Sequence, residues 1–236
     1  MSQPYPGSEL ALFAGARHWK GYLAATLAPF IGRRVLEVGA GIGGNIPYLH
    51  HGRVEDWLCL EPDPVMAGEL ADRIAAGTLP RTCRVIADGI AALDSAAVFD
   101  TVLYLDVLEH IADDRAELRR AARCLAADGT LIVLAPAHPF LFSAFDAAIG
   151  HYRRYSRASL LAVAPPGLRL RRCRMLDSVG FFASLGNRLL LHSARPTAGE
   201  IAAWDRVMVP LSRALDPVTG HRFGKSVAAI WTQGAA

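Results

Sequence analysis

The chain has 236 residues, of which 52% are hydrophobic, and a formal net charge of +3. This length and apolar content are sufficient for one α/β core, so the chain is neither too short nor too polar to fold around a core of its own. The most apolar late stretch, residues 179–191, is interrupted by Asn187 and Arg188 and is shorter than the ~20 residues that a membrane span requires. Residues 1–6 lack the basic and apolar blocks of a signal peptide, so we expect a cytoplasmic protein.

Charge is unevenly distributed along the chain. Residues 1–150 carry 12 Lys and Arg against 18 Asp and Glu, whereas residues 151–236 carry 13 against 4. The basic second part favours a phosphate- or carboxylate-bearing substrate, or an anionic membrane surface, with a solvated basic face as the alternative. Nucleic acid is not favoured, because the sequence has neither a low-complexity basic tail nor a recognised RNA-binding module. The four cysteines form no C-x-x-C pair, which predicts buried thiols in a reducing compartment.

The first predicted helix runs from Glu9 to about Ala28, capped by Ser8, and we expect it to lie over a ligand. A buried strand then enters the glycine turn of residues 35–44, VLEVGAGIGG. Glycines allow the backbone to turn sharply and approach a ligand closely, and the helix predicted from Gly44 to His50 offers free N–H groups. The glycine spacing also satisfies the dinucleotide motif, so by itself it does not separate a nicotinamide enzyme from other nucleotide-binding enzymes.

Acidic residues follow the next three predicted strands. Residues 57–60 end at Glu61, residues 83–87 end at Asp88-Gly89, and residues 100–105 end at Asp106. A carboxylate at the end of the second strand is placed to accept from both ribose hydroxyls. One at the end of the third strand suits an exocyclic adenine amine.

The rest of the chain continues this alternation as far as about residue 177, which predicts a parallel sheet covered by helices on both faces. Helices are predicted over 63–76, 113–126 and 156–163, and strands over 130–135, 168–175 and 225–231. Residues 178–217 are predicted to be mostly helical, with breaks near Arg195-Pro196 and Val209-Pro210. Their apolar side chains could wall off an acceptor pocket, and these are Phe181, Phe182, Leu185, Leu189, Leu190, Leu191, Trp204, Val207 and Met208.

The order of these motifs resembles a class I methyltransferase dependent on S-adenosylmethionine (SAM), over nearly the whole chain. More narrowly, the PAHP segment at 136–139 and the GHYRRY segment at 150–155 resemble a bacterial subfamily of the type 11 or 12 methyltransferases. The resemblance implies SAM as cofactor and S-adenosylhomocysteine as product. It also implies a Rossmann-like, doubly wound sheet of seven strands, mostly parallel with an antiparallel last strand, and a helical insertion between strands 6 and 7.

In that reading the chain is one domain, with residues 1–30 over the cofactor, 31–177 as core, 178–217 as insertion or lid, and 218–236 as last strand. Glu37 would help orient the methionine amino group, often through water. Glu61 would hold ribose, and Asp88 with Gly89 would hold adenine. The other expected cofactor contacts are Gly39, Gly41, Leu105, Asp106 and, from the first helix, Trp19.

An acceptor can also need a proton removed, and imidazole is suited to this near neutral pH. His110 and His151 are favoured over His138, with Asp146 orienting either His151 or Arg154. Tyr155, together with Tyr152, is expected to contact the substrate.

A metal is the less favoured alternative. Asp106, Glu109 and His110 resemble the E-x-x-E-H motif of ubiquinone-pathway O-methyltransferases, with Asp in place of the first Glu. Two carboxylates and an imidazole can hold a divalent cation. Many metal-free SAM enzymes have a similar segment, so we predict no metal.

The predicted function is methyl transfer from SAM to a small-molecule or lipid-like acceptor with apolar bulk and an anionic group, with peripheral membrane contact as an option. The alternatives are a SAM-binding regulator or partner subunit without catalysis and, supported only by the glycine spacing, a nicotinamide-dependent oxidoreductase. The acceptor, the atom methylated and the oligomeric state stay open.

Overall fold

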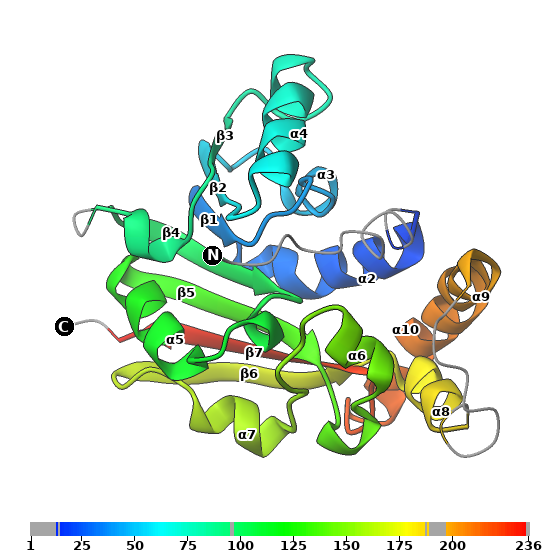
Figure 1. Cartoon of the computed structure of the whole chain (residues 1–236). Coiled ribbons are helices and arrows are strands. Elements are labelled where there is room, and N and C mark those ends of the chain that lie inside the picture. The colour runs from blue at the N-terminus through cyan, green and yellow to red at the C-terminus, as the bar shows by residue number, and fades with distance from the viewer. Residues whose placement is uncertain (1–12, 14, 95–96, 187, 189–196, 235–236) are drawn as a thin grey trace.

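The computed structural model describes residues 13, 15–94, 97–186, 188 and 197–234, and its centre is one seven-stranded sheet (Figure 1). The strands are β1 (Arg34–Val38), β2 (Asp56–Leu60), β3 (Cys83–Ile86), β4 (Phe99–Leu105), β5 (Leu125–Pro136), β6 (Leu168–Leu176) and β7 (Ser226–Gln233). Their order is β3-β2-β1-β4-β5-β7-β6, and β7 runs antiparallel to both of its neighbours. The predicted fold class is confirmed.

Helices cover both faces of this sheet (Figure 1). The α-helices are α2 (Arg17–Leu27), α3 (Ile46–Leu49), α4 (Pro64–Ala75), α5 (Asp114–Arg123), α6 (Ala144–Ala148), α7 (Arg157–Ala162), α8 (Ser178–Gly186), α9 (Ala198–Ala203) and α10 (Val209–Val218). Side chains of β1 alternate between two apolar clusters, with Val35 in the one that contains α2 and Leu36 in the one that contains α5 and α7. This alternation follows from the two-residue period of a strand.

The predicted N-terminal helix is interrupted. Phe13 is helical, but Gly15 lies in a turn and Ala16 has non-helical dihedral angles (φ −76°, ψ 70°), so helix α2 begins at Arg17. The expected cap, Ser8, lies outside the described residues. The starts predicted for α4, α5 and α7 at residues 63, 113 and 156 are confirmed, because the side chains of Asp63, Asp113 and Ser156 each accept from a backbone N–H of the first turn.

Strand β5 is longer than predicted. It begins at Leu125, pairs there with Phe99, and continues through Asp128, whose φ of +60° marks an irregularity in the pairing. Because Leu125 is already in the sheet, α5 ends at Arg123 instead of Ala126.

The segment between β6 and β7 is helical, as predicted, over the residues described. The expected break at Val209-Pro210 is wrong: a π-helical turn, Trp204–Met208, continues directly into α10. The Val209 N–H bonds to the carbonyl of Trp204, so the widened turn accommodates Pro210, which has no N–H of its own. The break expected near Arg195 lies outside the described residues. Among the described helices, none has the length and apolar character to cross a membrane.

Buried carboxylates join this helical segment to α2. Asp216 accepts from the Tyr22 hydroxyl at 2.7 Å and from the backbone N–H of Asp177 at 2.8 Å and Ser178 at 3.1 Å. Asp205 accepts from the backbone N–H of Trp19 at 2.9 Å. The helix over the expected ligand is therefore positioned by residues nearly 200 positions later in the chain.

We expect Asp216→Ala to lower the free energy of unfolding by about 3 kcal/mol or more, because three buried donors lose their acceptor. Urea denaturation measures this loss, with the exposed Asp72→Ala on α4 as a control within about 0.5 kcal/mol of wild type. An equal effect of the two substitutions would contradict the role given to Asp216.

Candidate active site

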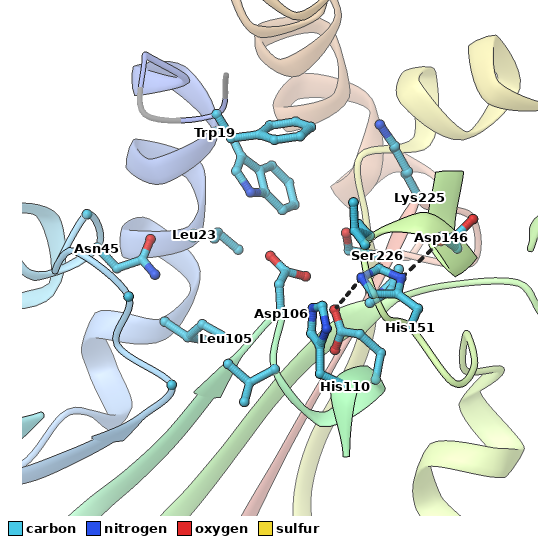
Figure 2. Close-up of a pocket in the computed structure, with 18 of the residues that line it drawn as sticks. Trp19, Leu23, Asn45, Leu105, Asp106, His110, Asp146, His151, Lys225 and Ser226 are labelled. Atoms are coloured by element: carbon cyan, nitrogen blue, oxygen red, sulfur yellow. Dashed lines mark hydrogen bonds and ion pairs between the residues drawn. The ribbon is translucent and has the colours of Figure 1, made fainter. Parts of the chain in front are cut away.

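A cavity of about 1870 Å³ lies at the carboxyl ends of the central parallel strands, between α2 and the helices that precede β7 (Figure 2). It is lined at one end by the glycine turn after β1 and the residues that follow β2. At the other end lie the loops after β4 and β5 and the start of β7. Ligands bind at this edge of doubly wound sheets because the loops that follow the strands converge there.

The glycine turn forms a close-packed wall of the cavity. Gly39 and Gly41 both have positive φ, at +67° and +55°. A Cβ atom on Gly39 would stand 2.6 Å from a methyl carbon of Val107, so only glycine fits there. Residues 39–41 line the cavity, so the backbone of this turn can pack against a ligand.

Glu61 is buried at the end of β2 and faces the cavity. Its two carboxylate oxygens accept from the backbone N–H of Gly41 at 2.7 Å and of Asp63 at 2.9 Å. Burial raises its pKa, while these two hydrogen bonds act in the opposite direction. Each carboxylate oxygen has capacity for a further donor, so Glu61 can still accept from ribose hydroxyls.

Glu37 is buried below the cavity and does not line it. It accepts from the indole N–H of Trp57 at 3.0 Å and from the side chain of Asn45, which does line the cavity. Glu37 can therefore act on a ligand only through Asn45 or a bridging water, and its role at a methionine amino group stays a prediction.

Burial raises the pKa of Glu37 to about 7, against 4.5 for an ordinary Glu. The folded protein holds this proton more tightly than the unfolded chain, so stability falls as pH rises from about 4.5 to about 7 and is then constant. We expect Glu37→Gln to remove about 3 kcal/mol of this pH dependence. Urea midpoints of wild type and variant at pH 5 and pH 8 give the difference. If the two proteins show parallel pH profiles, Glu37 does not carry the effect.

The other predicted cofactor residues divide between the cavity wall and its rim. Trp19, Leu105, Asp106 and Gly89 line the cavity. Asp88 does not: it is exposed beside the opening, and its carboxylate accepts from the Gly89 N–H at 2.7 Å. Asp106 has a positive φ of +56°, and water in the cavity can reach its side chain. Protein atoms surround the carboxylate on its other sides, and this partial desolvation raises its pKa. The structure therefore places Asp88 as a rim residue.

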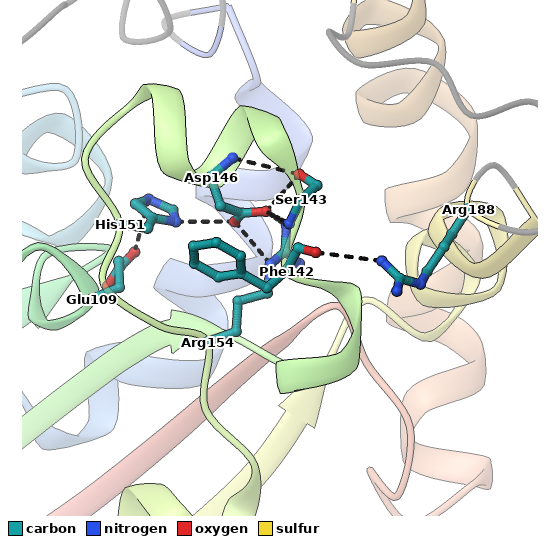
Figure 3. Close-up of polar contacts among 7 residues, drawn as sticks. All are labelled: Glu109, Phe142, Ser143, Asp146, His151, Arg154 and Arg188. Atoms are coloured by element: carbon teal, nitrogen blue, oxygen red, sulfur yellow. Dashed lines mark hydrogen bonds and ion pairs between the residues drawn. The ribbon is translucent and has the colours of Figure 1, made fainter.

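A hydrogen-bonded group occupies the far end of the cavity (Figure 3). His151 Nδ1 lies 3.0 Å from Asp146, which also accepts from Arg154 through both Nε (2.8 Å) and Nη2 (3.0 Å). These contacts hold the pKa of Asp146 below its usual range. An ionised Asp146 makes Nδ1 the protonated ring nitrogen, which leaves Nε2 of His151 as an acceptor, 3.9 Å from Glu109.

His110 stands beside His151, with ring centroids 4.5 Å apart and planes nearly perpendicular. Burial, which disfavours the charged form, lowers the pKa of His110 to about 4. His110 is therefore neutral at physiological pH. The two histidines favoured by the sequence come together, although they are 41 positions apart.

Tyr155 and His138 are placed elsewhere. Tyr155 is 1% exposed, donates to Asp114 at 2.8 Å and does not line the cavity, so its expected contact with substrate is corrected to a structural role. His138 lies within 3.0 Å of the Gly224 carbonyl through Nε2 and packs on Phe181, which leaves it outside the cavity wall. The ranking of His110 and His151 above His138 agrees with this geometry.

Three residues that share one cavity end could also hold a cation. Glu109, His110 and His151 offer ligand atoms within 4.8 Å of one another, and Oε2 of Glu109 is buried without a hydrogen-bond partner. Asp106, the first residue of the motif seen in the sequence, is not part of this group. The ligand set suggested by the sequence is thus corrected, and the absence of a metal stays a prediction.

Sequence reasoning gave no cavity role to Asn45, Lys225 or Ser226, which all line the cavity (Figure 2). Lys225 and Ser226 lie far from every other motif and reach the site only because β7 inserts between β5 and β6. The proximity of Asn45 to the glycine turn was the one available signal.

Known proteins support the interpretation of this cavity. Residues 36–131 match a family model described as a methyltransferase domain. A ubiquinone biosynthesis O-methyltransferase of Azorhizobium caulinodans is 36% identical over 50% of this chain and 45% of its own length. Ajmaline N-methyltransferase of Rauvolfia serpentina is 26% identical over 78% of this chain and 58% of its own. The chain thus spans about half the length of these two curated relatives.

A solved structure shares the fold. The N-methyltransferase NodS of Bradyrhizobium japonicum, in complex with S-adenosylhomocysteine, has a TM-score of 0.57 at 14% identity, covering 92% of this chain and 85% of that one. In the present chain the glycine turn at residues 39–41, which lines the cavity, and the remaining acceptor capacity of Glu61 fit such a nucleoside. Residues 36–131 therefore match a methyltransferase domain, and the chain shares the fold of a solved methyltransferase.

Proposed function

We propose that this protein transfers a methyl group from SAM to a small-molecule acceptor with apolar bulk and an anionic group. The observation that carries the proposal is one continuous cavity, which joins the glycine turn and Glu61 at one end to His110, His151 and Asp106 at the other. When bound, SAM supplies a methyl group on a positively charged sulfur that leaves as a neutral thioether. The protein's main task is then to place the acceptor in line and exclude water.

The residues of the chain divide this task. Gly39–Gly41 and Glu61 would hold the nucleoside, and Trp19 and Leu105 would line the reacting end. We propose His151 as the general base for an acceptor hydroxyl or amine, because Asp146 fixes its ring with Nε2 free to accept a proton. His110, neutral beside it, would line the pocket.

The helical segment before β7 supports an apolar acceptor. Trp204 and Met208, both expected from the sequence to form a wall, line the cavity together with Ile201. Phe182 and Val207, also expected there, are exposed instead. The expected wall residues 189–191 lie outside the described residues.

Calorimetric titration with SAM and S-adenosylhomocysteine, beside an NADH control, tests the cofactor. Transfer of a labelled methyl group to a panel of apolar anionic compounds tests the reaction. Binding of both nucleosides without turnover of any compound would favour a SAM-binding regulator. Binding of NADH alone would favour an oxidoreductase and overturn the proposal.

We also propose a peripheral contact with an anionic membrane surface. Val207, Leu211, Leu215 and Val218 are between 46% and 82% exposed and recur at helical spacing along the continuous helix from Trp204 to Val218, which supports such a contact. We expect the protein to sediment with phosphatidylglycerol vesicles at low salt and Leu211→Ser/Leu215→Ser to reduce the bound fraction severalfold. No sedimentation of the wild type would contradict this part of the proposal.

A further inference from the structure

Lysine is rare in this chain and is confined to the cavity. Only two of the 25 basic residues are lysines, Lys20 and Lys225, and both line the cavity, at opposite ends. Lys20 lies beside Gly44 and Tyr48 at the cofactor end, whereas Lys225 immediately precedes β7 at the acceptor end. Because an ammonium is a compact point charge and a guanidinium is a planar fork, this use of lysine points to a specific role.

The backbone around Lys225 is fixed from both sides. Its N–H donates to the Asp177 carbonyl at 3.0 Å, and its own carbonyl accepts from the Ala137 N–H at 2.8 Å. A Cβ on the preceding Gly224 would stand 2.3 Å from the backbone nitrogen of Leu176, so no larger residue fits there. The position of the Lys225 Cα atom is thus fixed by the ends of β5 and β6 and the start of β7.

The side chain of Lys225 rests on an equally well-held surface. Its Nζ lies 5.0 Å from the ring centre of Trp204, and the Trp204 indole N–H donates to the Asp177 carboxylate at 2.7 Å. Asp177 also accepts from the Ser212 hydroxyl at 2.7 Å. One buried carboxylate therefore fixes both the indole and, through its backbone, the lysine above it.

Lys225 has no anionic partner among the residues that the structure describes. No described carboxylate lies within ion-pair distance of Nζ, although Asp106, Asp146, Asp177 and Arg154 act on it electrostatically. Burial lowers its pKa, which is the direction expected for a cation without a direct counter-charge. The Asp146 carboxylate already forms hydrogen bonds with Arg154 and His151. The Asp177 carboxylate already accepts from Trp204 and Ser212.

The other cations of the cavity are engaged or exposed. Arg154 is committed to Asp146, Arg188 donates to the Phe142 carbonyl at 3.3 Å, and Arg73 donates to the Ile42 carbonyl. Arg17 is exposed at the start of α2. Among the described residues at the acceptor end, Lys225 is thus the cation whose charge is available to a ligand.

We propose that Lys225 binds the anionic group, a carboxylate or a phosphate, of the methyl acceptor, and that the acceptor's apolar body packs against Trp204. This inference rests on the proposed function and specifies the substrate class of the same cavity. It makes Lys225 a determinant of specificity that selects anionic acceptors over neutral molecules of the same shape.

Calorimetry on the protein saturated with S-adenosylhomocysteine tests this, using 2-naphthoate and 1-naphthyl phosphate against the neutral 2-naphthamide. We expect at least one anion to bind about tenfold to a hundredfold more tightly than the amide, and Lys225→Met to abolish the preference. Lys225→Arg should keep part of it. The exposed Arg206→Met, on the same helix as Trp204 but outside the cavity wall, should leave it unchanged.

Several outcomes overturn the inference. If neither anion is preferred by the wild type, or if Lys225→Met keeps the preference, Lys225 does not select an anionic acceptor. If Lys225→Met weakens S-adenosylhomocysteine binding more than about tenfold while its circular dichroism melting curve is native, Lys225 serves the cofactor carboxylate instead. Failure of the wild type to bind S-adenosylhomocysteine at all would be a failure of the proposed function, and is read from the same titrations.

Discussion

Glu61→Gln is expected to weaken S-adenosylhomocysteine binding about tenfold to a hundredfold. The carboxylate accepts from Gly41 and Asp63 at 2.7 and 2.9 Å, and a glutamine turns one of these acceptors into a donor that faces a backbone N–H. It also loses the charge-assisted bonds to ribose, each worth about 1.5–3 kcal/mol. Calorimetric titration measures the dissociation constant of the variant and the wild type.

The matched control is Glu69→Gln, an exposed residue of α4 that does not line the cavity. It should bind S-adenosylhomocysteine within about twofold of wild type. Glu61 also accepts from the Gly41 N–H of the glycine turn, so the substitution could unfold this turn. A thermal melting curve of Glu61→Gln close to that of the wild type shows that the variant remains folded. Unchanged affinity in a folded Glu61→Gln protein would remove Glu61 from the cofactor site.

His151→Gln is expected to lower the rate of methyl transfer about 10²- to 10⁴-fold, the range that a general base contributes. S-adenosylhomocysteine affinity should stay within about threefold, because His151 lies at the acceptor end of the cavity. Asp146→Asn should give a smaller loss of rate and change the pH profile, since an amide no longer fixes Nδ1 as the protonated nitrogen. Initial rates with the acceptor identified in the labelled-methyl screen measure both effects.

His138→Gln is the control for this pair of variants. His138 was the third histidine indicated by the sequence, but its ring nitrogen is occupied by the Gly224 carbonyl and it does not line the cavity. Its rate should match the wild type. If His151→Gln is as active as His138→Gln, the acceptor needs no base at this position. An acceptor whose nucleophile is already ionised would behave in this way.

Local signals in the sequence determined much of the fold and of the cofactor half of the site. Strands read as short apolar runs, and Asp63, Asp113 and Ser156 marked helix starts because N-caps are satisfied within four residues. Gly39, Gly41 and Glu61 were readable for a related reason. They follow consecutive strands at one sheet edge, so chain order already implies that they converge.

The tertiary structure alone decided the acceptor half. Lys225 and Ser226 reach the cavity through the antiparallel insertion of β7 between β5 and β6, and Tyr155, which is adjacent in sequence to Arg154, turns into the core to meet Asp114. Glu37 has the expected strand position, yet it is sealed below the surface by Trp57 and Asn45. Sequence patterns record which face or strand end a residue occupies. Whether its side chain is open to a cavity depends on packing partners from distant segments, which no local pattern encodes.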